Sequence, residues 1–174
     1  MIAMGSYSVG KKEVCEWIRE RFSTERDDTI LDVGACDGKW RKLLPDYVMD
    51  AVEVFEPYAK ALTGYRKVYN RDIRRFRYDY YDLIIFGDVI EHLEVKDAQK
   101  VLEYAKTRCL DMVIAVPWLY KQDEVDGNKW QKHLQDDLTP EIFEERYPGF
   151  EVLYDAGNYC YYHWARQADK DVVK

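Results

Sequence analysis

A chain of 174 residues is long enough for one domain with a sizeable core, and its 47% apolar and 34% charged residues are typical of a globular protein. Its 26 basic and 33 acidic residues give a net charge of −7, which disfavours a nucleic-acid partner because such affinity depends on phosphate contacts. No apolar run is long enough to span a membrane, and the N-terminal residues carry no secretion signal. The four cysteines lack the spacing of metal ligands, and we expect them to be reduced thiols in a cytoplasmic protein.

Strand and helix patterns alternate along the chain from residue 29 to residue 116. An amphipathic pattern before them predicts a helix over residues 8–23, and this helix is a candidate lid. Strands are expected at residues 29–33, 51–55, 67–70, 82–86 and 112–116. Helices are expected at residues 39–45, at 57–64 and around 98–105.

The last part of the chain predicts one more helix and a pair of strands. Thr139 suits an N-cap and Pro140 suits the first helical position, so a helix is expected to begin there. Alternating segments at 150–154 and 159–166 predict an antiparallel pair. The whole pattern predicts one α/β domain over residues 1–174, a doubly wound, Rossmann-like, mostly parallel sheet with helices on both faces. Ligands of such sheets bind beyond the carboxyl ends of the strands.

The first strand leads into an acid and a turn that contains glycine. Asp32, Gly34 and Gly38 fall where the chain passes from strand to helix, and the glycines let a ligand approach the backbone closely. A dinucleotide fingerprint starting at Gly34 needs glycine where Cys36 and Lys39 stand, and a P-loop needs a hydroxyl after Lys39. Neither phosphate-binding pattern is present, which disfavours an NAD-linked enzyme. An acid beside a glycine turn instead suits a nucleoside ligand that carries a positive charge.

A second acid stands at the expected end of the second strand. Glu56 follows Asp32 by 24 residues, close to the spacing of about 20 at which an acid binds ribose hydroxyls in nucleotide-binding sheets. A carboxylate can accept hydrogen bonds from both the 2′ and the 3′ hydroxyl. Glu53 is the competing residue, but it falls within the expected strand rather than at its tip.

These motifs resemble those of the class I S-adenosylmethionine (SAM)-dependent methyltransferases. Asp32, Gly34 and Gly38 match the first motif of that family, with Cys36 in place of its middle glycine. The segment 87–93, Gly-Asp-Val-Ile-Glu-His-Leu, resembles motif IV of the small-molecule members. The two motifs occur in the family's order and after the expected strands.

A later passage extends the resemblance towards the end of the chain. His133 is followed by Thr-Pro-Glu at 139–141 and by Gly-Phe-Glu-Val at 149–152, as in the same methyltransferases. This passage forms part of the acceptor pocket in the family, so His133 is a candidate base or acceptor ligand. His92 is either catalytic or a structural histidine that ties its loop to the backbone.

The resemblance implies a seven-stranded sheet with an antiparallel last strand, SAM as the cofactor and S-adenosylhomocysteine (SAH) as the product. It assigns the ribose to Glu56, places Asp72 near the adenine, and implies no metal. The cofactor residues that it indicates are Asp32, Gly34, Ala35, Cys36, Gly38, Glu56, Pro57, Asp72, Ile73, Asp88 and Val89. The catalytic candidates are Glu91, His92 and His133.

The implied reaction is in-line transfer of a methyl group from SAM to a small molecule, in which orientation matters more than covalent help. The residues do not choose between oxygen, nitrogen and sulfur acceptors, and a homodimer stays open. The alternative is a non-catalytic binding or regulatory protein of the same fold, including an RNA-associated one, because Cys36 departs from the motif and no base stands out. Basic and aromatic residues interleave between 65 and 81, as in binders of single-stranded RNA, although nearby acids can offset that charge.

Overall fold

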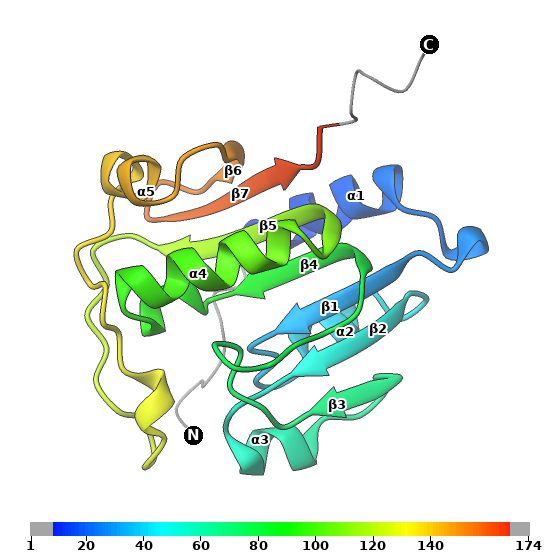
Figure 1. The fold of residues 1–174 in the computed structure, drawn as a ribbon, viewed down its shortest axis with the longest axis horizontal. Coiled ribbons are helices and arrows are strands. Elements are labelled where there is room, and N and C mark those ends of the chain that lie inside the picture. The colour runs from blue at the N-terminus through cyan, green and yellow to red at the C-terminus, as the bar shows by residue number, and fades with distance from the viewer. Residues whose placement is uncertain (1–8, 168–174) are drawn as a thin grey trace.

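Seven strands form one sheet in the order β3-β2-β1-β4-β5-β7-β6 in a computed structural model of the chain, which describes residues 9–167 (Figure 1). The strands are β1 (Thr29–Val33), β2 (Val48–Val52), β3 (Lys67–Tyr69), β4 (Tyr81–Gly87), β5 (Cys109–Pro117), β6 (Glu151–Asp155) and β7 (Tyr159–Ala165). Strands β1 to β5 pair in parallel, whereas β7 runs antiparallel to both of its neighbours. The expected doubly wound sheet with an antiparallel last strand is therefore confirmed.

Helices cover both faces of the sheet, with α4 in front and α2 behind in the view of Figure 1. They are α1 (Lys11–Arg21), α2 (Lys39–Leu43), α3 (Glu56–Ala61), α4 (Val95–Lys106) and α5 (Pro140–Arg146), with short 3₁₀ turns η1 (Thr24–Arg26), η2 (Ile90–His92) and η3 (Lys129–Gln131). The helix expected over residues 8–23 is α1, and residue 8 lies outside the described residues. Within residues 9–167, no helix is both long enough and apolar enough to cross a membrane.

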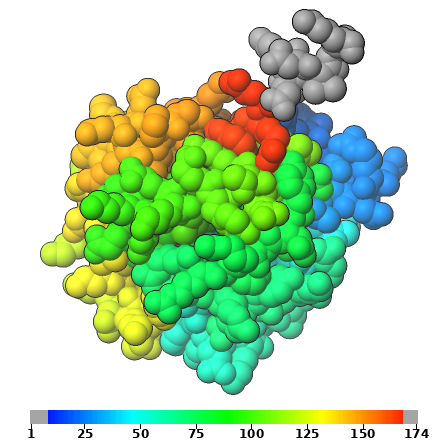
Figure 2. Space-filling view, in the orientation of Figure 1, coloured from blue at the N-terminus to red at the C-terminus, as the bar shows by residue number. Residues whose placement is uncertain are grey.

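Two apolar clusters form the core, one on each face of the sheet. Neighbouring residues of a strand point to opposite faces. Ile84 therefore belongs to the same cluster as Met112 and Leu102 of α4, whereas Ile85 belongs to the other cluster, with Ile18 of α1. The space-filling view shows α4 (green) over the front face (Figure 2). Burial on both faces explains why the parallel strands have nearly continuous apolar sequences.

The second strand lies three residues earlier than the sequence predicts. The expected strand at 51–55 is wrong, because β2 covers Val48–Val52. Its central residue, Asp50, is only 1% exposed, and an acid within an apolar run hides the strand pattern. The carboxylate accepts hydrogen bonds from Arg66 (2.9 and 2.7 Å) and from the Tyr81 hydroxyl (2.7 Å), so its burial is compensated. This shift decides which glutamate reaches the end of the strand.

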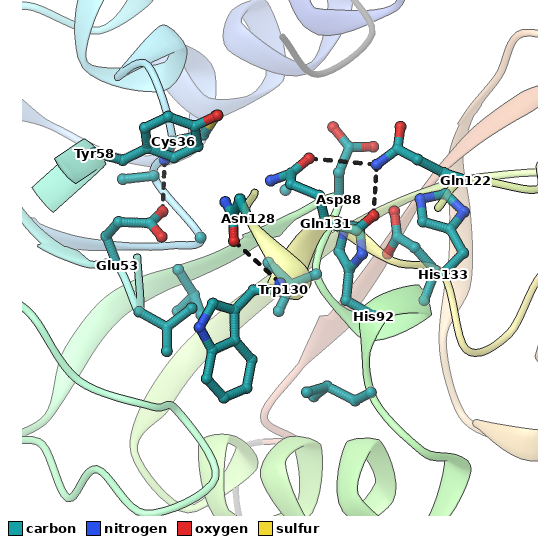
Figure 3. A pocket seen from close by; sticks show the side chains of 18 of the residues that line it. Cys36, Glu53, Tyr58, Asp88, His92, Gln122, Asn128, Trp130, Gln131 and His133 are labelled. Atoms are coloured by element: carbon teal, nitrogen blue, oxygen red, sulfur yellow. Dashed lines mark hydrogen bonds between the residues drawn. The ribbon is translucent and has the colours of Figure 1, made fainter. Parts of the chain in front are cut away.

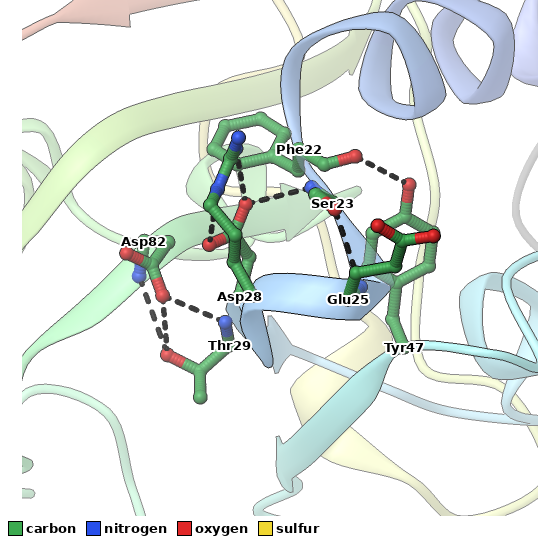
Figure 4. A network of polar contacts seen from close by, with 8 residues as sticks. Phe22, Ser23, Glu25, Asp28, Thr29, Tyr47 and Asp82 are labelled. Carbon is green, nitrogen blue, oxygen red and sulfur yellow. Dashed lines mark hydrogen bonds and ion pairs between the residues drawn. The ribbon is translucent and has the colours of Figure 1, made fainter.

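Hydrogen bonds at the amino ends of the strands fix the connection from α1 into the sheet (Figure 4). The amide of Thr29 donates to Asp82 of β4 at 2.7 Å, and the amide of Ser23 donates to Asp28 at 2.7 Å. The Tyr47 hydroxyl donates to the carbonyl of Phe22 at 3.0 Å. These contacts use the polar groups at this edge, and they leave the opposite edge, at the carboxyl ends, for a ligand.

The Asp50 network gives a test of this account. We expect Arg66→Ala to lower the free energy of unfolding by about 2 kcal/mol, because it leaves the buried Asp50 carboxylate with Tyr81 as its one partner. The loss is limited because the Arg66 side chain is half exposed to solvent. Urea unfolding measures the change. Lys60→Ala, which removes an exposed ion pair with Glu56, is the control and should leave the midpoint unchanged. Equal effects of the two substitutions would contradict the assignment.

Candidate functional site

A cavity of about 530 Å³ lies at the carboxyl ends of the parallel strands. Its walls come from the loops that follow β1, β2, β3 and β4 and from the β5–α5 loop, residues 118–139. Figure 3 shows Glu53 and Cys36 on one side of the cavity, His92 and His133 on the other, and Trp130 between them. A volume of this size suits small ligands.

The loop after β1 needs glycine where it meets the loop after β4. Gly34 has φ 71°, and a Cβ at this position would lie 2.5 Å from Cγ2 of Val89. The amide of Gly34 also donates to the carbonyl of Val52 at 2.9 Å. The backbone of the loop after β1 therefore lies against the Val89 side chain of the loop after β4, and Ala35, Cys36 and Val89 line the cavity there.

Glu53, rather than Glu56, lines the cavity. Glu53 follows the last residue of β2, is 6% exposed, and accepts hydrogen bonds from the amides of Cys36 (3.0 Å) and Phe55 (2.8 Å). Burial raises its pKa above the ordinary value. The Glu56 side chain is 63% exposed, and its carboxylate pairs with Lys60 at 2.7 Å. The sequence-based placement of Glu56 and Pro57 in the site is thus corrected, because β2 ends three residues early and α3 carries both away from the cavity wall.

Two other predicted cofactor residues support the glycine loop from behind. Asp32 is fully buried, does not line the cavity, and accepts a hydrogen bond from the Tyr65 hydroxyl at 2.6 Å. Burial raises the pKa of Asp32 to about 7, although the Tyr65 hydrogen bond lowers it in part. Gly38, at φ 72°, is the residue before α2 and packs near Leu62 and Tyr65, also outside the cavity lining.

The remaining predicted cofactor residues do line the cavity. Asp72 pairs with Arg74 at 2.6 Å, and the neighbouring Ile73 is nearly buried. Asp88 follows β4 with φ 56°, and its carboxylate accepts a hydrogen bond from the hydroxyl of Tyr159. Burial raises the pKa of Asp88, and the nearby Lys11 ammonium limits the rise.

Only two of the three histidines belong to the cavity. His163 lies within β7 and bonds to Asp111 at 2.6 Å, away from the cavity lining, as its position in the last strand predicts. His92 and His133 lie in the lining, with ring centroids 4.6 Å apart. Tyr159, at the start of β7, also lines the cavity.

The two cavity histidines are oriented by backbone carbonyls. Nδ1 of His92 lies 3.1 Å from the carbonyl oxygen of Lys132, and Nδ1 of His133 lies 2.6 Å from that of Tyr120. Because a carbonyl only accepts, each Nδ1 carries the proton. Burial lowers the pKa of His92 to about 4 and also lowers that of His133, so both rings are neutral at pH 7 and each Nε2 retains its lone pair.

Glu91 lies beneath these rings in a fully buried position. Its side chain is 0% exposed, and neither carboxyl oxygen has a hydrogen-bond partner among the described residues. Burial, with the nearby carboxylate of Asp88, raises the pKa of Glu91 well above its usual range. The backbone carbonyl of Glu91 accepts hydrogen bonds from the amides of Leu134 (2.8 Å) and Gln135 (3.1 Å). The β5–α5 loop is thereby fixed to η2.

Sequence analysis missed several residues that the β5–α5 loop brings to the cavity. Gln122, Asn128 and Gln131 line it together with Tyr120 and Trp130. No periodic pattern marks a loop, so the sequence gives no signal that places the three amide side chains at the cavity.

Solved structures share this fold. A SAM-dependent methyltransferase from Clostridium acetobutylicum ATCC 824 matches with a TM-score of 0.67 and 13% identity over 92% of this chain and 94% of that chain. The N-terminal domain of EvdMO1, with SAH bound, matches with a TM-score of 0.60 and 14% identity over 87% of this chain and 81% of that domain. The pyocyanin biosynthetic protein PhzM matches with a TM-score of 0.64 and 14% identity over 90% of this chain. The match covers 55% of PhzM, so this chain spans about half of that protein's length. No family model and no curated protein sequence matches the chain.

The buried acid behind the glycine loop generates a prediction on pH and stability. The pKa of Asp32 is about 7 in the folded chain and about 4 when unfolded, so the folded state retains a proton that the unfolded state releases. Stability should therefore fall as pH rises from about 4 to about 7. Asp32→Asn keeps an acceptor for Tyr65 and should reduce that fall by about 2 kcal/mol in urea unfolding.

The exposed Asp46→Asn variant is the control for this measurement. It should retain the wild-type dependence of stability on pH. Equal slopes for wild type and Asp32→Asn would show that Asp32 is ionised in the folded chain.

The chain shares its architecture with these solved structures. Identities of 13–14% establish the architecture only. The chain therefore has the fold of the class I SAM-dependent methyltransferases.

Proposed function

We propose that this chain is a SAM-dependent methyltransferase that acts on a small-molecule acceptor in the cytoplasm. The observation that carries the proposal is Glu53, a buried carboxylate at the end of β2 that is held by two backbone amides beside the glycine loop. The two amides leave acceptor capacity on both oxygens, enough for two ribose hydroxyls. The four cysteines of the chain are free thiols, which suits a reducing compartment such as the cytoplasm.

The residues around Glu53 are suited to the rest of the cofactor. Backbone at Gly34 and Cys36 permits close approach of the methionine part of SAM, and Asp88 lines the same cavity as an acid that could face the sulfonium. Ile73 offers an apolar contact for adenine, with Asp72 as an acceptor for its amino group. The fold shared with SAM-dependent methyltransferases supports the same assignment.

The cysteine in the glycine loop does not argue against this cofactor. Cys36 adopts φ 47°, in the left-handed region that glycine usually occupies, and its amide bonds to Glu53. The strain of such a residue is of order 1 kcal/mol and is offset by that hydrogen bond. The loop therefore keeps the backbone course that a glycine would allow.

The acceptor half of the cavity lies between the two histidines and the β5–α5 loop. Nε2 of His92 and of His133 can each accept a hydrogen bond from the methyl acceptor, while Tyr120 and Trp130 add aromatic surface to the cavity wall. Alignment of the acceptor opposite the leaving sulfur accounts for most of the catalysis, since SAM already activates its methyl group.

A role in RNA binding is less favoured than small-molecule chemistry. Of the basic residues between 65 and 81, Arg66 bonds to Asp50 and Arg74 bonds to both Asp72 and Asp97. Arg77 lies over the Tyr104 ring at 4.7 Å. Charges paired within the protein contribute less to a phosphate backbone, and the net charge is −7.

Two glutamates three residues apart provide a matched test of the cofactor site. We expect SAH to bind the wild-type chain in calorimetric titration, and Glu53→Gln to weaken it by about 10-fold to 100-fold through loss of charged hydrogen bonds. Glu56→Gln should change affinity by less than about twofold, because its carboxylate faces Lys60 outside the cavity.

Two results would argue against the proposal. Absence of SAM and SAH binding by folded wild-type protein would refute the cofactor assignment. A greater loss of SAH affinity in Glu56→Gln than in Glu53→Gln would indicate that Glu56, the residue expected from the sequence, binds the ribose.

A further inference from the structure

Glu91, His92 and His133 bring three metal-binding groups to one point of the cavity. One ligand atom from each lies within 4.8 Å of the other two. His92 and Glu91 come from η2, and His133 comes from the β5–α5 loop, about 40 residues later in the chain. In Figure 3 the His92 and His133 side chains lie next to each other at the same end of the cavity. Among residues 9–167 no ion pair accounts for the cluster, and both histidine rings bond through Nδ1 to backbone.

The orientation of the rings is that of metal ligands. A histidine that binds a metal through one ring nitrogen usually donates the other N–H to a carbonyl or a carboxylate, which fixes the ring and its tautomer. Both rings do this here, to the carbonyls of Lys132 and Tyr120. The remaining nitrogen of each ring, Nε2, is the atom with the available lone pair.

The burial of Glu91 points to a bound cation independently of the histidine rings. Its carboxylate is wholly buried, and neither oxygen has a partner within residues 9–167. A buried carboxylate without a hydrogen bond is strongly unfavourable unless something compensates its charge. A bound cation provides that compensation, and two neutral imidazoles beside the carboxylate complete a recognised set of ligands for divalent transition metals.

We propose that Glu91, His92 and His133 bind a divalent transition metal of the Zn²⁺ class at the acceptor end of the cavity. This departs from the sequence-based expectation of no metal. In a tetrahedral site, ligand atoms about 2.0–2.2 Å from the ion lie about 3.3–3.6 Å from one another. The three ligand atoms lie within 4.8 Å of one another, so side-chain rotations that close them by about 1 Å would bring them into this geometry. Three protein ligands leave a fourth coordination position open to the cavity.

The surrounding backbone holds the ligands in place before any ion binds. Amides of Leu134 and Gln135, next to His133, donate to the carbonyl of Glu91. The Gln135 side chain is buried and donates to the carbonyls of Ile90 (2.7 Å) and Leu93 (3.0 Å) on either side of the Glu91–His92 pair. The two segments therefore form one rigid unit, as a preorganised metal site requires.

The metal indicates the class of acceptor, and this step rests on the proposed function. An acceptor hydroxyl at the open position ionises more readily, and its proton passes to water. The resulting alkoxide forms the new oxygen–carbon bond as the bond from carbon to the SAM sulfur breaks, and the sulfur retains that electron pair in SAH. The site thus favours small molecules methylated at oxygen.

Metal titration of the full chain, without a histidine tag and after chelation, tests the proposal. With Co²⁺ as the probe, we expect one equivalent to bind with visible d–d absorption and to be displaced by Zn²⁺. His133→Gln and Glu91→Gln should each weaken binding by about 100-fold, at or above the loss typical of metal-site substitutions. The control is His163→Gln, which alters the third histidine and should change affinity by less than about twofold.

The outcomes separate the metal proposal from the methyltransferase proposal when SAH titration is run on the same samples. SAH binding without a stoichiometric Co²⁺ site overturns the metal proposal alone. A Co²⁺ site that depends on His133, without SAH binding, overturns the methyltransferase alone. Binding of Co²⁺ that all three variants retain also overturns the metal site. If Glu91→Gln does not fold, the comparison of His133→Gln with His163→Gln decides.

Discussion

The cavity depends on the close approach of Gly34 to Val89. A Cβ on Gly34 would lie 2.5 Å from the valine side chain, so only glycine lets the loop after β1 lie against the loop after β4. The first loop also presents the Cys36 amide to Glu53, and the second continues through Asp88 into η2. Both halves of the site are thus positioned by one contact between two neighbouring strand ends.

The fold could be predicted from sequence because its strands are buried on both faces. Continuous apolar runs marked β1, β4 and β5, and their alternation with helices gave the doubly wound sheet. The pattern failed at β2, where buried Asp50 interrupts the run and depends on Arg66, a partner that comes after α3. That single error moved the expected strand end by three residues and exchanged Glu53 for Glu56.

The residues of the candidate site were predictable in kind but not in arrangement. The motif with Glu91 and His92 could be recognised, as could His133, yet their proximity depends on hydrogen bonds between η2 and a loop without periodic pattern. The direction of each imidazole depends on carbonyls of Lys132 and Tyr120, which no residue type specifies. Burial of Glu91 without a partner is likewise visible only in three dimensions.

The neutral histidines constrain the chemistry on the acceptor side. Both rings have lowered pKa values and are neutral at pH 7, and the Nδ1–H of each ring donates to a backbone carbonyl. Each ring therefore presents the lone pair of Nε2, and no positive charge, to the cavity. In the proposed reaction they would accept hydrogen bonds rather than donate protons, and neutral rings would not repel the sulfonium of SAM. Asp88, which bonds to Tyr159, adds the nearby acidic group on the cofactor side.

The anchoring of the β5–α5 loop has a consequence for how such a protein diversifies. The loop is fixed near its start by the bond from Leu119 to Leu138 and near its end by the bonds to Glu91. Between these anchors, Tyr120, Gln122 and Trp130 face the cavity without contributing to the sheet. Substitutions there can alter which acceptor fits at little cost to folding. Under the proposed function, acceptor specificity and stability would thus be encoded in separate parts of the chain, and selection could change one while preserving the other.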